Sequence, residues 1–286
     1  MAGISGNRRI ILAGGSGFLG RSLAADLGRL GYEPVILTRR PVHGRSPGPE
    51  VAWDGRTVGP WALTLEGAAA VVNLAGRSAN CRFTPENRRD ILESRVDSVR
   101  VLGQAIRACT RPPRAFIQVA STGIYDDSKT LCDEEARPGD SFLAGVCLAW
   151  ERAWREQALP ASTRTCLLRV GWPLAAGGGA LGKLAGLARW GLGGSFGCGG
   201  QFISWLHSED LNRIFRWTVE RGDMTGVFNA TGPHPVTNRE FMQALRRALG
   251  RSWSPPTPAC LIRLGAWLAG TDAKLALSGR RAVPRR

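Results

Sequence analysis

Three glycines near the start of the chain are spaced as in a loop that binds phosphate. Gly14 and Gly17 lie between the apolar run Ile10–Ala13 and the amphipathic stretch Leu19–Leu30, and Gly20 is the second residue of that stretch. Between a strand and a helix, the first glycine allows a tight turn, the second lets backbone amides approach a pyrophosphate, and the third lets the helix pack on the strand. The alternative is an ordinary tight turn. The residues between these glycines that are expected to contact the same phosphates are Ser16, Phe18 and Leu19.

Two arginines follow the next apolar run. Folds that prefer NAD(H) usually carry an acidic residue there, which binds the ribose 2′-hydroxyl. Here Val35–Leu37 continues into Thr38, Arg39 and Arg40. A carboxylate would repel a 2′-phosphate, whereas guanidinium groups bind it with charge-assisted hydrogen bonds. The sequence therefore predicts NADP(H) as the cofactor, and the alternative is that the arginines form a solvated strand end.

The glycine loop is expected to be held by a sheet with helices on both faces. Short apolar runs predict strands, and the longer amphipathic stretches between them predict helices. The predicted strands are Ile10–Ala13, Pro34–Leu37, Ala70–Leu74, Ala115–Ala120 and Thr165–Val170. The predicted helices are Leu19–Leu30, Asn87–Ala108 and Phe142–Gln157. This alternation predicts an α/β fold with a doubly wound parallel Rossmann sheet.

A smaller lobe is expected after Val170, where a glycine-rich segment, Ala176–Gly200, begins. The elements predicted beyond it are a helix over 208–220, a strand over Val227–Ala230, a helix over 238–249 capped by Thr237 or Asn238, and an apolar helix after Pro258. We expect an NADP-binding Rossmann domain formed by residues 7–170 with 204–230. A smaller C-terminal substrate lobe would then comprise residues 171–203 with 231–286.

The net charge of +15 is almost entirely due to arginine. The basic residues form scattered doublets and no run of five or more. Nucleic-acid binding usually shows clustered basic residues, so the pattern favours small anionic ligands and no nucleic acid as partner. The seven cysteines include no Cys-x-x-Cys pair, so no metal site is expected. No apolar run reaches the ~20 residues that span a bilayer. Because the first strand starts at about Arg9, no cleavable targeting peptide is expected, and the expected location is the cytoplasm.

Several segments together resemble a known family. They are Gly14–Gly20, Leu37–Pro41, Val72–Gly76, Ser94–Arg95, Trp205–Leu211 and Phe228–Ala230. Taken together they resemble the extended, epimerase-like branch of the short-chain dehydrogenase/reductase family. The resemblance is closest to an epimerase-like group sometimes labelled a cell-division inhibitor, and it covers nearly the whole chain.

The resemblance implies further cofactor contacts. Leu74, Ala75 and Gly76 would line the cofactor after the fourth strand. Asp90 would contact a ribose, and Arg95 would reach the phosphate side of the cofactor. Trp172 would line the nicotinamide end. The alternative for Asp90 is a solvated carboxylate, and the alternative for Trp172 is a core aromatic residue.

The catalytic residues of the family are only partly present. Members use a Ser or Thr, a Tyr and a Lys, in which the Tyr transfers a proton and the Lys lowers its pKa. Ser121 fits the first role and precedes Tyr125 in a Ser-x-x-x-Tyr pattern. The Tyr-x-x-x-Lys pair is missing, because Leu143 and Cys147 stand in its place. Tyr125 is the remaining candidate for proton transfer, and its alternative role is packing in the loop.

Two other patterns are weaker. Gly177–Lys183 has the spacing of a nucleotide P-loop, but Leu184 follows it and cannot bind magnesium, so a loop over the substrate cleft is expected there. His207 and Asp210 have no nucleophile beside them. The sequence thus predicts an NADP(H)-dependent oxidoreductase or epimerase acting on a small substrate, with nucleotide-linked compounds among the candidates. The alternative is a non-catalytic NADP(H)-binding regulator, and the sequence assigns no oligomeric state.

Overall fold

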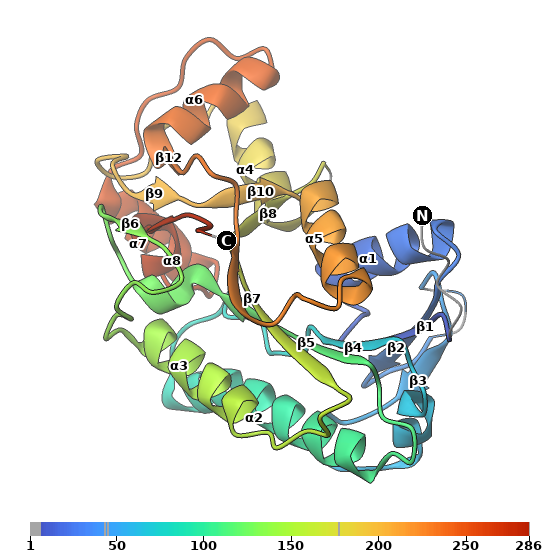
Figure 1. Ribbon diagram of the computed structural model, residues 1–286. Coiled ribbons are helices and arrows are strands. Elements are labelled where there is room, and N and C mark those ends of the chain that lie inside the picture. Colours follow the sequence, from blue (N-terminus) through green and yellow to red (C-terminus); the bar gives the residue numbers. More distant parts are fainter. Residues whose placement is uncertain (1–6, 43, 45, 177, 286) are drawn as a thin grey trace.

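A parallel sheet of seven strands forms the centre of the computed structural model, which describes residues 7–42, 44, 46–176 and 178–285 (Figure 1). The strands, in their order across the sheet, are β3 (Glu50–Ala52), β2 (Glu33–Thr38), β1 (Arg9–Ala13), β4 (Ala70–Asn73), β5 (Ala115–Ser121), β7 (Arg164–Val170) and β11 (Gly226–Ala230). The chain builds outward from β1 to β3 and then returns to β4 on the other side of β1. In such sheets ligands bind beyond the carboxyl ends of the strands at this switch point.

Helices cover both faces of the sheet, as the sequence predicts. They are α1 (Phe18–Arg29) and α5 (Ser208–Glu220) on one face, and α2 (Pro85–Ala108) and α3 (Phe142–Arg155) with the short helix η1 (Pro60–Leu65) on the other (Figure 1). Side chains of β1 alternate between the two cores. Ile10 and Leu12 pack toward α1 and α5, whereas Ile11 and Ala13 pack toward α2 and α3. The predicted doubly wound Rossmann architecture is confirmed.

The later part of the chain forms a lobe beyond the carboxyl ends of β7 and β11 (Figure 1). Its elements are β8 (Trp172–Leu174), α4 (Gly179–Arg189), β9 (Phe202–Ile203), β10 (Trp205–His207), β12 (Val236–Thr237), α6 (Asn238–Ala248), α7 (Ala259–Leu268), α8 (Lys274–Leu277) and β13 (Arg281–Ala282). A small core of Leu184, Ile203, Phe241 and Met242 joins α4, β9 and α6. The predicted residue limits of the two domains stay a prediction.

Two strand pairs organise the lobe, and the second of them ties it to the segment that follows β5. β8 pairs with β10, and β13 pairs with β6 (Leu131–Cys132), which follows the short helix η2 (Thr122–Tyr125) after β5. The second pairing brings the last described residues of the chain back to the carboxyl end of β5.

The structure corrects one local prediction and resolves another. The glycine-rich segment expected as a loop over the cleft is helical from Gly179 onward, because Leu184 and Ala188 of α4 pack inward. Gly177 lies outside the described residues. The N-cap of α6 is Thr237, whose hydroxyl accepts from the N–H of Glu240 in a capping box.

Within the described ranges, no helix is long and apolar enough to cross a membrane. Among the same residues, no group of three or more His, Cys, Asp or Glu side chains is arranged to hold a metal ion.

Candidate functional site

The glycine loop has the tight backbone geometry that its sequence requires. Gly14 has a φ of +74°, and a Cβ atom there would lie 2.8 Å from the Cα of Ala75. A Cβ on Gly20 would lie 2.3 Å from the carbonyl oxygen of Gly15. Neither position accepts a side chain without moving backbone. The first glycine thus lets the loop touch the end of β4, and the third lets α1 pack on the loop.

The N-terminus of α1 is open to an anion. Its N-cap residue, Gly17, has no side chain to cap the helix, and the first turn holds no acidic residue. A Cβ on Gly17 would approach only the carbonyl of Gly14, at 3.7 Å. The first backbone N–H groups of a helix have no intrahelical partners and carry the positive end of the helix dipole. The residues present therefore fit a bound pyrophosphate.

The end of β2 supplies positive charge beside this loop. Arg39 and Arg40 are exposed, and neither forms an ion pair within the described part of the chain. Thr38 just before them is buried, and its hydroxyl lies 3.0 Å from the hydroxyl of Ser16 in the glycine loop. Two exposed arginines without an ion pair thus follow directly on the strand end that touches the loop, an arrangement that fits a ribose 2′-phosphate.

The end of β4 forms the other wall of this cradle. Asn73 is fully buried, and its amide group donates to Gln118 Oε1 at 2.9 Å and to Ser98 Oγ at 3.1 Å. Its side-chain oxygen accepts from the N–H of Ala75 at 3.1 Å, while Leu74 N–H donates to the Ala13 carbonyl. This network holds the predicted contacts Leu74, Ala75 and Gly76 beside the glycine loop.

The remaining predicted cofactor residues lie in different surroundings. The guanidinium of Arg95 lies against Gly76, so the structure brings this residue to the cradle. Asp90 forms an ion pair with Arg77 at the surface of α2. Trp172 packs against the apolar core of the lobe. Their roles toward the cofactor stay predictions.

The lobe touches the glycine loop through an aromatic ring. A Cβ atom on Gly178 would lie 2.4 Å from Phe18 Cε2. The Phe18 ring therefore fills the space that a side chain at position 178 would need. Gly179, the first residue of α4, has a φ of +61° and lies against the same ring. The start of α1 and the start of α4 are therefore in direct contact.

Ser121 ends β5 at the same edge of the sheet. Its hydroxyl accepts from the N–H of Gly123 at 3.0 Å and caps η2. A Cβ on Gly123 would lie 3.2 Å from Ser121 Oγ and 3.7 Å from Cys147 Sγ, so α3 presents Cys147 to this serine. Burial raises the pKa of Cys147 to about 12 despite the opposing charge of Arg95. At neutral pH the sulfur is thus a thiol, which cannot replace the ammonium group of a lysine.

Tyr125 is held in a buried polar network. Its hydroxyl donates to Asn229 Oδ1 and accepts from Arg169 Nη1, both at 2.7 Å. The residue is 4% exposed. Burial raises the pKa of Tyr125 above its usual value, although Arg169 opposes that shift. The phenol proton would have to leave Asn229 before it could reach a substrate, and this geometry favours the packing role.

Arg169 itself is paired with a buried carboxylate. Its Nε and Nη2 atoms donate to the two oxygens of Glu151 at 2.7 and 2.9 Å. Burial alone would lower the pKa of Arg169, but the hydrogen bonds and charge of Glu151 raise it above its usual value. Sequence reasoning missed this pair, although an arginine inside the apolar run of β7 was a usable signal.

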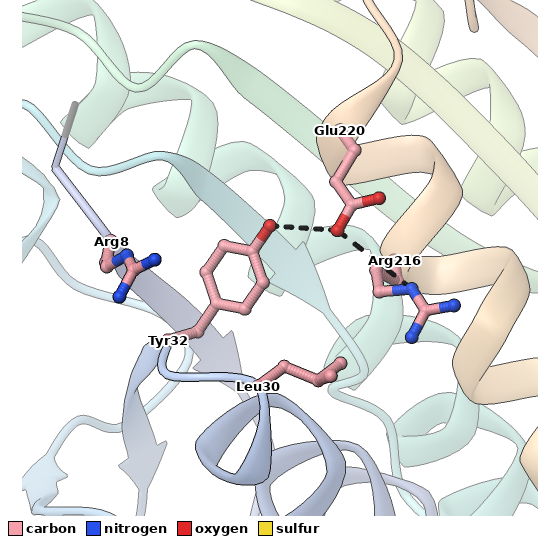
Figure 2. Close-up of a pocket in the computed structure, with 5 residues that line it drawn as sticks. All are labelled: Arg8, Leu30, Tyr32, Arg216 and Glu220. Carbon is pink, nitrogen blue, oxygen red and sulfur yellow. Dashed lines mark hydrogen bonds and ion pairs between the residues drawn. The ribbon is translucent and has the colours of Figure 1, made fainter. Parts of the chain in front are cut away.

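The pocket drawn in Figure 2 lies at the opposite edge of the sheet. It is a cavity of about 280 Å³ lined by Arg8, Leu30, Tyr32, Arg216 and Glu220. Arg8 precedes β1 and Tyr32 precedes β2, so this cavity is at the amino ends of the strands. The Tyr32 hydroxyl already donates to Glu220 at 3.1 Å. The cradle at the carboxyl ends of the strands is the better candidate site, because its glycine loop and the open N-terminus of α1 fit a bound pyrophosphate.

Comparisons with known proteins identify the family of the chain. Residues 10–145 match the model of the NAD dependent epimerase/dehydratase family. The human epimerase family protein SDR39U1 is 34% identical over 97% of this chain and 92% of its own length. The Bacillus subtilis epimerase family protein YfhF is 30% identical over 97% of this chain and 90% of its own length. A crystal structure of human SDR39U1 with NADPH superposes with a TM-score of 0.85, at 33% identity, covering 97% of this chain and 91% of that one.

Proposed function

The chain belongs to the epimerase family, and from that membership we propose that it is an NADP(H)-dependent oxidoreductase or epimerase acting on a small molecule. The observation that carries the proposal is the cradle formed by the glycine loop, the open N-terminus of α1 and the free arginines after β2. The similar human protein was crystallised with NADPH, which supports the same cofactor here. Bound NADP(H) would supply or accept a hydride.

The chain's own residues then have to position the substrate and handle a proton. We assign the substrate to the space between the carboxyl edge of the sheet and the lobe, where the Ser121 hydroxyl would hydrogen-bond the reacting oxygen. Nucleotide-linked compounds belong among the candidate substrates, and a cytoplasmic location remains part of the proposal. The neutral thiol of Cys147, in the place of the family's lysine, favours a changed proton route.

Selective binding of NADPH is the first test. At a free concentration 100 times its dissociation constant, NADPH is expected to stabilise the folded protein by about 2.7 kcal/mol. Thermal unfolding with NADPH and with NADH at equal concentrations measures this, and NADPH is expected to raise Tm by several degrees more. Equal shifts for the two cofactors would contradict the assignment of the arginines.

The roles of Ser121 and Tyr125 are separated by two variants. Following NADPH absorbance with a panel of carbonyl and sugar-nucleotide substrates, Ser121→Ala is expected to lower kcat/KM about tenfold, the loss of one hydrogen bond of about 1.4 kcal/mol. Tyr125→Phe is expected to change kcat/KM by less than about threefold, because its hydroxyl is held by Asn229 and Arg169. A large loss in Tyr125→Phe would instead restore its proposed role in proton transfer.

The non-catalytic alternative is tested by the same panel. It is motivated by Leu143 and Cys147, which occupy the places of the missing Tyr and Lys. Tight NADPH binding without turnover of any substrate in the panel would favour a regulatory or partner-binding protein.

A further inference from the structure

Arg280 reaches the same point as Ser121 from the other end of the chain. It stands just before β13, whose pairing with β6 returns the chain to the carboxyl end of β5. A Cβ atom on Gly123 would lie 3.5 Å from Arg280 Nη1, as well as 3.2 Å from Ser121 Oγ and 3.7 Å from Cys147 Sγ. The guanidinium, the hydroxyl and the thiol thus surround one small space.

The Arg280 guanidinium has no hydrogen bond or ion pair with any residue that the structure describes. Arg280 is half-buried, and this burial lowers its pKa because the charge has lost part of its hydration. Asp126 and Asp127 are the acidic groups that act on it, and both lie beyond the 4.0 Å of an ion pair. Asp126 accepts from the N–H of Ser141, and Asp127 accepts from the N–H of Gly279. A desolvated, unpaired guanidinium is costly unless a ligand pairs with it.

A second guanidinium approaches from α2. Arg95 lies over the Trp150 ring with 5.0 Å between its Cζ and the ring centroid, and its Nη1 donates to the carbonyls of Arg77 and Ile91 at 2.9 Å. Its Nη2 has no hydrogen bond with any described residue. Burial lowers the pKa of Arg95 as well, and the charges of Arg95 and Arg280 both act on Cys147. Because the thiol is neutral, Cys147 does not offset the positive charge of either arginine.

We propose that Arg280, supported by Arg95, binds an anionic group of the substrate, a carboxylate or a phosphate, beside the atom that Ser121 contacts. The planar fork of a guanidinium matches either group, and a partly desolvated site strengthens the interaction. This inference rests on the proposed function and gives it a substrate class: small carbonyl or hydroxyl compounds that carry an anionic group close to the reacting carbon.

Calorimetric titration of the full chain tests this, with and without saturating NADPH. The probes are malonate for a carboxylate, methylphosphonate for a phosphate, and malonamide as a neutral molecule of similar shape. One of the two anions is expected to bind with a stoichiometry of one in the presence of NADPH, and malonamide is not. The anion that binds shows whether the site takes a carboxylate or a phosphate.

Three variants identify the residue responsible. Arg280→Leu is expected to weaken binding of the anion at least tenfold, and Arg280→Lys is expected to be intermediate because it keeps the charge without the fork. Arg281→Leu is the matched control, since that side chain lies over the Phe202 ring, and it is expected to leave binding unchanged. Thermal unfolding verifies that each variant is folded.

Three outcomes would overturn the inference. In the first, the NADPH-bound protein binds neither anion. In the second, saturating NADPH abolishes anion binding. In the third, Arg280→Leu and Arg281→Leu weaken anion binding equally. Failure of NADPH itself to bind is a separate result. It would remove the proposed function, while the dependence of anion binding on Arg280 would still decide the inference.

Discussion

Replacing Arg169 by methionine is expected to lower the free energy of unfolding by about 3 kcal/mol. Glu151 is fully buried and its two oxygens accept from Arg169, so Arg169→Met leaves a buried carboxylate without its main partner. The same change removes the donor to the Tyr125 hydroxyl. Breaking a buried pair from one side is strongly destabilising, because the remaining charge keeps its desolvation cost.

Urea unfolding of Arg169→Met and of a matched variant measures this effect. Arg155→Met removes the second partner of the same Glu151, at 2.8 Å, but Arg155 is half-exposed. An exposed ion pair contributes about 0.2–1 kcal/mol, so the control is expected to lose much less stability. A loss of less than about 1 kcal/mol in Arg169→Met, no larger than that of the control, would show that the buried network does not hold this part of the fold.

Replacing Arg39 by glutamate is expected to weaken NADPH binding roughly 100-fold. The change removes charge-assisted hydrogen bonds worth about 1.5–3 kcal/mol and places a negative charge next to the 2′-phosphate. The NADH affinity is expected to change little, because NADH has no such phosphate. Fluorescence titration with both cofactors gives the two dissociation constants.

Arg29→Glu is the control for the change in net charge. Arg29 is exposed at the far end of α1, where it pairs with Asp26, and it has no contact with the glycine loop. It is expected to leave both affinities within about twofold, because exposed charges beyond a Debye length are screened. If Arg39→Glu binds NADPH as tightly as the unchanged protein, the arginines are only a solvated strand end.

The cofactor side of the site could be predicted because its signals are local. The glycine spacing, the strand before it and the helix after it all lie within residues 10–30, and each has a separate physical requirement. The predicted strands of the central sheet were found within one or two residues. β3 was missed because a strand of three residues shows no periodicity, and α4 was missed because its glycines indicate a loop.

The substrate side could not be predicted because its residues meet only through long-range contacts. Arg280 reaches Ser121 through the pairing of the two-residue strands β13 and β6, which have no pattern to detect. Glu151 and Arg169 lie on a helix and a strand that are adjacent only in the fold. Counting along α3 did place Cys147 correctly toward Ser121, since helical spacing fixes which residues share a face.

The contact between Phe18 and the two glycines at the start of α4 joins the cofactor cradle directly to the lobe. The ring is part of the helix terminus that would hold the cofactor phosphates, and the glycines begin the helix of the lobe above it. A substrate that draws α4 toward the sheet therefore also acts on the first residue of α1. Any coupling carried through this contact is reciprocal, because each ligand must then change the affinity of the other by the same factor.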